Sequence, residues 1–205
     1  MKTLPVNIEE FGFVEREEKN GEYIKNRCGR DFLYYALHYF YPSEFSPQKN
    51  NPQEIERKGI FGLSVPSWLA WTQAQFIHIP KLLASKNLTL SINGREINSF
   101  NQFARAILTP NGKNGAAAID NVEKIVDSGD TVGIDIALGF GGLLDHIMFV
   151  YGYDTDNFYI CDTHKAAGIE YTKLFEGNRY FMRLPKAEIL KRWTRFGRVW
   201  EVKRK

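Results

Sequence analysis

The sequence predicts an α+β fold in which a mainly helical first part packs on a mainly antiparallel sheet. Apolar residues recur at three- and four-residue spacings in several segments before residue 126, which is typical of helices. From residue 131 onward, alternating, β-branched and aromatic runs indicate strands. Because helices come first and strands later, the layout differs from an alternating βαβ fold. We expect one domain over residues 1–205, mainly helical over about 1–115 and mainly β over about 116–205.

The clearest helix is expected from Arg30 to Tyr41. Its apolar stripe consists of Phe32, Leu33, Ala36, Leu37 and Phe40. Pro42 ends this helix, because proline lacks a backbone donor and disfavours the α conformation of the residue before it. Further helices are expected from Ser64 or Pro66 toward Pro80, over 100–108 after a Ser99 cap, over 117–126 and over 186–194.

The strand signals are strongest in the second part of the chain. Thr131 opens an alternating run that ends in the glycine-rich segment 139–142. Two apolar runs, 146–153 and 158–161, are separated by Asp154-Thr155-Asp156-Asn157, so they predict a hairpin. Other short strands are expected at 88–92, before an Asn93-Gly94 turn, and at 169–172, 179–184 and 199–202.

Composition excludes several classes of protein. Hydrophobic residues make up 43% and charged residues 25%, which excludes a disordered or fibrous chain. The net charge is +3, from 27 Lys and Arg against 24 Asp and Glu, and this excess predicts no nucleic-acid partner. The basic end Lys203-Arg204-Lys205 is expected to be a solvated terminus. The sequence contains no uninterrupted apolar run of about 18 residues, so no membrane span is expected. Residues 1–13 lack the continuous apolar core expected of a signal peptide. Two cysteines favour a reduced, cytoplasmic protein.

Cys28 is the residue that most clearly indicates a chemical role for this protein. It lies in Asn26-Arg27-Cys28-Gly29-Arg30-Asp31, immediately before the first expected helix. A thiol at this place faces the positive end of the helix dipole and several free backbone N–H groups. Both favour the thiolate, which is the nucleophilic form. The same place also suits a small residue that packs a helix end, and position alone leaves both interpretations open.

His146 and Asp162 are the candidate partners of such a nucleophile. His146 opens the first strand of the expected hairpin, and Asp162 follows its second strand. The turn between the strands returns Asp162 to the edge where His146 begins. An acid beside an imidazole fixes its tautomer and supports its cationic form. The alternative is that His146 caps a strand and Asp162 starts a turn.

These residues resemble those of papain-like cysteine peptidases of the bacteriocin-processing, double-glycine leader peptidase type. The matching features are Cys28-Gly29 opening a helix, the segment 146–154 that begins with His and ends in Gly-Tyr-Asp, and the segment 158–162 that ends in Asp. The resemblance spans about residues 22–202 and implies a papain-like fold. It also implies that Cys28 is the nucleophile, His146 the general base and then acid, and Asp162 the orienting carboxylate.

The chain departs from that family at two places. Glu22 stands six residues before Cys28, where the family usually has a glutamine that donates a hydrogen bond to the oxyanion. An ionised carboxylate cannot donate, so Asn26 or Asn20, with the backbone N–H of Cys28, is the expected replacement. Asp162 is followed by Thr163-His164 rather than proline, which places a competing histidine nearby.

Other candidate sites are interpreted as structural. Cys161 lies inside an apolar strand and is expected to be buried and inert. The cysteines and histidines lack zinc spacing, 154–157 lacks the rest of a calcium loop, and 139–142 lacks the Lys of a phosphate-binding loop. Trp68 and Trp71 are expected to be core residues, and His38 and His78 to be packing or surface histidines. We therefore expect no metal and no cofactor.

The leading hypothesis is a thiol hydrolase that cleaves a peptide or isopeptide bond of a peptide or protein substrate through an acyl-enzyme intermediate. Two alternatives remain open. Glu22 favours a binding module that has kept the fold and lost turnover. The same three residues would also serve a transglutaminase-like acyltransferase, which hands the acyl group to an amine instead of water.

Overall fold

The computed structural model describes residues 1–6, 18–19, 22–23, 28–45, 79–110, 112, 114–139, 144–162, 172–175, 178–194 and 196–205. Its helices are α2 (Cys28–Phe40), α5 (Ile79–Ser85), α6 (Phe100–Leu108), α7 (Gly115–Ser128) and α8 (Lys186–Arg192). Its strands are β1 (Lys2–Thr3), β2 (Glu18–Lys19), β3 (Glu22–Tyr23), β4 (Leu88–Ile92), β5 (Arg95–Glu96), β6 (Thr131–Gly139), β7 (Leu144–Tyr153), β8 (Asn157–Cys161), β9 (Thr172–Phe175), β10 (Asn178–Pro185) and β11 (Arg198–Arg204). No helix within these ranges is long and apolar enough to cross a membrane.

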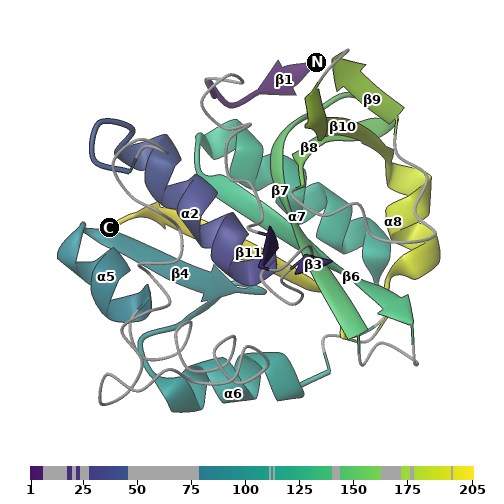
Figure 1. Ribbon diagram of the computed structural model, residues 1–205. Coiled ribbons are helices and arrows are strands. Elements are labelled where there is room, and N and C mark those ends of the chain that lie inside the picture. The colour runs from purple at the N-terminus through teal and green to yellow at the C-terminus, as the bar shows by residue number, and fades with distance from the viewer. Residues whose placement is uncertain are drawn as a thin grey trace.

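One nine-stranded sheet organises the molecule. Its order is β5-β4-β11-β6-β7-β8-β10-β9, with β1 added beside β7, and its neighbouring strands pair antiparallel. Helix α2 lies across one face of this sheet and α7 across the other (Figure 1). The predicted α+β class is therefore confirmed. Strands β4 and β5 come from the first part of the chain and join the same sheet as the later strands.

Two turns position the hairpins. Asn93 and Gly94 both have positive φ, 51° and 73°, which is the backbone of a two-residue turn that matches strand twist. In the β7–β8 hairpin, Oδ1 of Asp154 accepts hydrogen bonds from the backbone N–H groups of Asp156 at 2.9 Å and Asn157 at 2.8 Å. The Tyr159 hydroxyl donates to the other carboxylate oxygen, and these donors hold the pKa of Asp154 well below its usual range. The predicted hairpin is confirmed.

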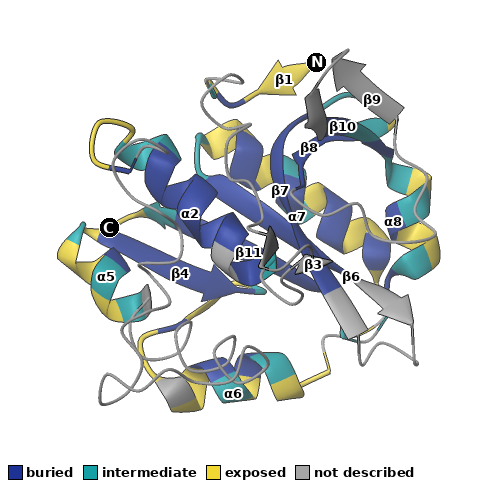
Figure 2. Ribbon diagram, in the orientation of Figure 1, coloured by how far each residue is buried: buried dark blue, intermediate teal, exposed yellow. Residues whose placement is uncertain are grey.

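Helix α2 is buried all round over most of its length, as Figure 2 shows. No residue from Asp31 to His38 is more than 2% exposed. The ring of Phe32 lies 6.2 Å from that of Phe149 on β7 and 6.3 Å from that of Trp200 on β11. Full burial of such a side chain stabilises the fold by about 1.5–3 kcal/mol. The helix is therefore a central element of the core.

Gly133 on β6 allows α2 to approach the sheet closely. A Cβ at this position would lie 2.8 Å from a ring carbon of Phe32 and 2.9 Å from Cδ1 of Ile147. Real Cβ atoms are essentially never found so close to other heavy atoms. The absence of a side chain at Gly133 thus sets the distance between α2 and the strands that it covers.

The structure differs from the sequence prediction at α5 and at the basic end of the chain, and two other expected elements lie largely outside the described residues. The helix expected between Ser64 and Pro80 falls almost entirely outside the described residues, whereas α5, which begins at Ile79, was not predicted. The strand expected at 169–172 is described only from Thr172, where β9 begins. The basic end is not simply a solvated terminus, because β11 continues to Arg204 and pairs with β4. Val202, fully buried, anchors that strand, while the side chains of Arg204 and Lys205 remain exposed.

We predict that Gly133→Ala lowers the free energy of unfolding by about 1–3 kcal/mol, because overpacking forces Phe32 or the backbone to shift. Urea unfolding measures this change. Phe32→Leu in the same chain should recover part of the loss, since the smaller side chain makes room. A Gly133→Ala variant as stable as the wild type would show that the close approach does not depend on this glycine.

Candidate active site

His146 and Asp162 form a buried pair at the end of the β7–β8 hairpin. Nε2 of His146 lies 2.8 Å from Oδ2 of Asp162, and both side chains are at most 4% exposed. Cys161, the last residue of β8, pairs with Phe149, so Asp162 falls one diagonal step from His146 across the two strands. The predicted approach of these two residues is confirmed. The Asp154 turn joins the two strands, and an irregularity between Val150 and Gly152 shifts their register by one residue before they reach the site.

Cys28 approaches the His146–Asp162 pair from helix α2, which covers one face of the sheet. It is the first residue of α2, it is a free thiol, and it is partly buried against the core. Cys28 is one of the groups that raise the pKa of the His146 imidazole, so its side chain lies close to the ring. Because Nε2 is engaged by Asp162, Nδ1 is the ring nitrogen that remains for the thiol. The structure thus brings Cys28, His146 and Asp162 together.

The electrostatics of this group favour a cationic imidazole. Burial by itself disfavours the cation and lowers the pKa of His146. The Asp162 carboxylate opposes this by charge and by its hydrogen bond, and Cys28 adds to the same effect. The net result is a pKa for His146 well above 6.5. An imidazole that stays protonated at neutral pH can hold a thiolate beside it.

The start of α2 offers a backbone hydrogen-bond donor for a negatively charged oxygen. As the first residue of α2, Cys28 has a backbone N–H that no earlier carbonyl of the helix accepts. Glu22 lies in β3, which pairs with β2 in a separate two-stranded sheet, and the position of its side chain is not described. Asn26, Asn20 and His164 lie outside the described residues. The backbone N–H is thus the described group best placed to act as an oxyanion donor.

Of the other candidate residues expected from the sequence, some are buried and the rest lie outside the described residues. Cys161 is 1% exposed, and burial raises the pKa of its thiol far above the usual value, as expected for an inert cysteine. His38 is buried and its Nδ1 bonds the carbonyl of Phe45, which is a packing role. Trp68, Trp71, His78 and residues 140–143 are outside the described ranges. Within those ranges, no three His, Cys, Asp or Glu side chains converge to hold a metal ion.

Two residues near this site were not singled out from the sequence. Asp31, in the first turn of α2, and Tyr35, one turn further, are each 2% exposed. Besides burial, the charge of Asp31 and the hydroxyl of Tyr35 affect the pKa of the Cys161 thiol. Burial and, to a smaller extent, the charge of Asp162 raise the pKa of Tyr35. The signal in the sequence is spacing: residues three and seven positions after Cys28 share its side of a helix.

No family model, no curated protein and no solved structure matches this chain. A thiol at a helix N-terminus, an imidazole close to it and a carboxylate on the second ring nitrogen form the arrangement that activates a cysteine nucleophile.

The raised pKa of His146 predicts a specific dependence of stability on pH. A group whose pKa is higher in the folded than in the unfolded state stabilises the fold fully below its unfolded value, here about 6.5. This stabilisation disappears as the pH rises through the higher folded value. The difference in unfolding free energy between the wild type and His146→Gln should therefore fall between pH 6.5 and pH 9. Urea unfolding across this range measures it, and a difference that is constant or grows would contradict the assignment.

Proposed function

We propose that this protein is a thiol hydrolase of papain-like fold that cleaves a peptide or isopeptide bond through an acyl-enzyme intermediate. The observation that carries the proposal is the contact of one imidazole with both a helix N-terminal cysteine and a buried carboxylate. The resemblance of the segments around Cys28, His146 and Asp162 to double-glycine leader peptidases supports the same reaction. Two free thiols fit a reducing compartment, so we place the protein in the cytoplasm.

In the first half of the reaction, the Cys28 thiolate attacks the carbonyl carbon of the scissile bond. A carbon–sulfur bond forms and the carbonyl oxygen becomes an oxyanion, which accepts a hydrogen bond from the backbone N–H of Cys28. As the intermediate collapses, the carbon–nitrogen bond breaks. The His146 imidazolium gives its Nδ1 proton to the leaving amine, which departs neutral.

In the second half, neutral His146 takes a proton from a water molecule that attacks the thioester. The carbon–oxygen bond forms, the carbon–sulfur bond breaks, and the carboxylic product leaves. The thiolate and the imidazolium are restored together. Throughout, Asp162 accepts the hydrogen bond from Nε2, which keeps Nδ1 directed at the reacting groups and stabilises the cation.

Alkylation of the native protein tests nucleophile activation without a known substrate. Iodoacetamide modification followed by peptide mass spectrometry should show Cys28 reacting rapidly at pH 6, where an ordinary thiol with a pKa of about 8.5 is mostly protonated. Cys161 in the same molecules is the internal control and should remain unmodified because it is buried. His146→Ala should slow the reaction of Cys28 at pH 6. Reaction no faster than that of a model thiol would favour the binding-module alternative instead.

Substrate turnover tests the roles of the three residues. On a peptide or acyl substrate that the wild type hydrolyses, Cys28→Ala should abolish turnover, and Asp162→Asn should lower kcat/KM by about 100-fold or more. Asp120→Asn, at an exposed carboxylate on α7, is the matched control and should have no effect. If replacement of Cys28, His146 and Asp162 each left the activity unchanged, the site assignment would be wrong. Transfer to an added primary amine in preference to water would identify an acyltransferase.

A further inference from the structure

Strand β7 contains one residue more than the strand beside it, between the hairpin turn and the proposed site. Val150 pairs with Ile160. The neighbouring pair joins Gly152 to Tyr159, so two steps along β7 match one step along β8. Tyr151 is the extra residue, and this arrangement is a β-bulge. Bulges are common next to active sites, where they change the direction in which a side chain points.

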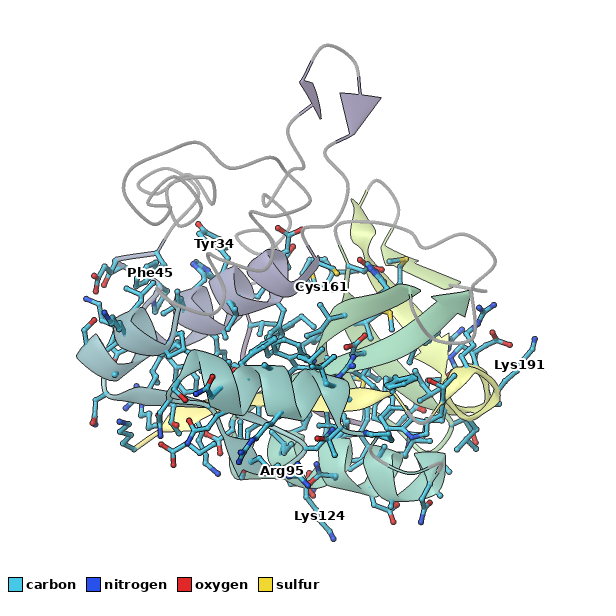
Figure 3. All side chains as sticks on the ribbon, turned by 90° about the horizontal axis from the view of Figure 1, so that it is seen from below. Tyr34, Phe45, Arg95, Lys124, Cys161 and Lys191 are labelled. Carbon is cyan, nitrogen blue, oxygen red and sulfur yellow. The ribbon has the colours of Figure 1, made fainter. Side chains whose placement is uncertain are left out.

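The bulge decides which face of the hairpin Asp162 occupies. Beyond it, Phe149 pairs with Cys161, the last residue of β8 (Figure 3). The next step in the same register places Asp162 opposite Met148, and residues two apart on a strand, such as Met148 and His146, share a face. Asp162 and His146 therefore meet, with Oδ2 and Nε2 2.8 Å apart. If the register of the turn continued unchanged, Asp162 would lie opposite Phe149 and point to the other face.

Strand β1 contacts the bulge from outside the hairpin. The last pair between β6 and β7 is at Val150, and β1 takes this side of β7 from there on. Thr3 of β1 pairs with Gly152. The next residue, Leu4, donates its backbone N–H to the carbonyl oxygen of Tyr151 at 2.6 Å. Because a bulged residue has no partner residue in the ladder, this bond holds the backbone at the irregular position.

Close packing fixes β1 against this part of β7. A Cβ on Gly152 would lie 2.6 Å from the carbonyl oxygen of Lys2 and 2.6 Å from Cγ2 of Thr3. Leu4 is 3% exposed and belongs to the hydrophobic core. Nζ of Lys2 lies 2.9 Å from Oδ1 of Asp127 on α7. Strand β1 is therefore joined to the core, to α7 and to the strand of the histidine.

We propose that β1 is a positioning element of the proposed active site, which holds the bulge at Tyr151 and so keeps Asp162 on the face where His146 lies. The backbone N–H of Leu4 is the group that acts on the bulge. The inference rests on the proposed function and deepens it. When β1 separates from β7, the two strands of the hairpin can slip into the register of the turn. Asp162 then turns away from Nε2, and His146 loses the carboxylate that supports its cationic form.

Leu4→Pro and Leu4→Ala form a matched pair that tests this role. Both remove most of the buried side chain, but only proline removes the N–H that binds the carbonyl of Tyr151. The readout is the rate of Cys28 alkylation by iodoacetamide from pH 5 to pH 10, with thermal unfolding to verify folding. We expect Leu4→Pro to react about five-fold more slowly than Leu4→Ala at pH 6, the effect of one ordinary hydrogen bond. The two rates should converge above pH 9, where most of an ordinary thiol is ionised.

Gly152→Ala tests the same contact from the side of β7, and it decides alone if Leu4→Pro does not fold. Its Cβ displaces β1, so Cys28 should again react more slowly at pH 6, and adding Leu4→Pro should change little. A Gly152→Ala profile equal to that of the wild type, a Leu4→Pro profile equal to that of Leu4→Ala, or additive effects would overturn the positioning role. Because Cys28 of the wild type must first react faster at pH 6 than a model thiol, a slow wild type would instead refute the proposed function.

Discussion

The docking of α2 on strands β6 and β7 of the sheet is the contact on which the site depends. Cys28 begins this helix, whereas His146 and Asp162 belong to one hairpin. The site therefore has two rigid parts, and their separation is set where Phe32 meets Gly133 and where Tyr35 meets Phe149. Since protein cores repack only at a cost, a small change at these contacts is transmitted to the distance between thiol and imidazole.

Burial makes the charges of the site interdependent. A single ion taken out of water is destabilised by several kcal/mol, so an isolated imidazolium at the position of His146 would lose its proton. Asp162 reverses this outcome because its carboxylate lies 2.8 Å from Nε2 in the same low-dielectric surroundings. Asp162 thus supports the imidazolium, and removal of its carboxylate leaves only Cys28 to oppose the effect of burial on His146.

Local chemistry made much of this molecule predictable. The Asp154 turn and the apolar runs beside it predicted the hairpin that brings Asp162 to His146, and Ser99 predicted the start of α6, where its Oγ accepts from the N–H of Gln102. Pairings between distant segments were not predictable, because periodicity does not say which strand lies beside which. The sequence therefore does not predict that β11 lies between β4 and β6, or that the basic end of the chain continues this strand.

The titration of the His146 imidazole by ¹⁵N NMR tests the central claim most directly, because it reports which nitrogen carries a proton and at what pH. The account predicts that His146 remains doubly protonated well above pH 6.5 in the wild type, with Nε2 protonated at every pH. It also predicts that Asp162→Asn lowers the midpoint, since the largest effect that opposes burial is then removed. A wild-type midpoint at or below 6.5, or one that Asp162→Asn leaves unchanged, would contradict the account.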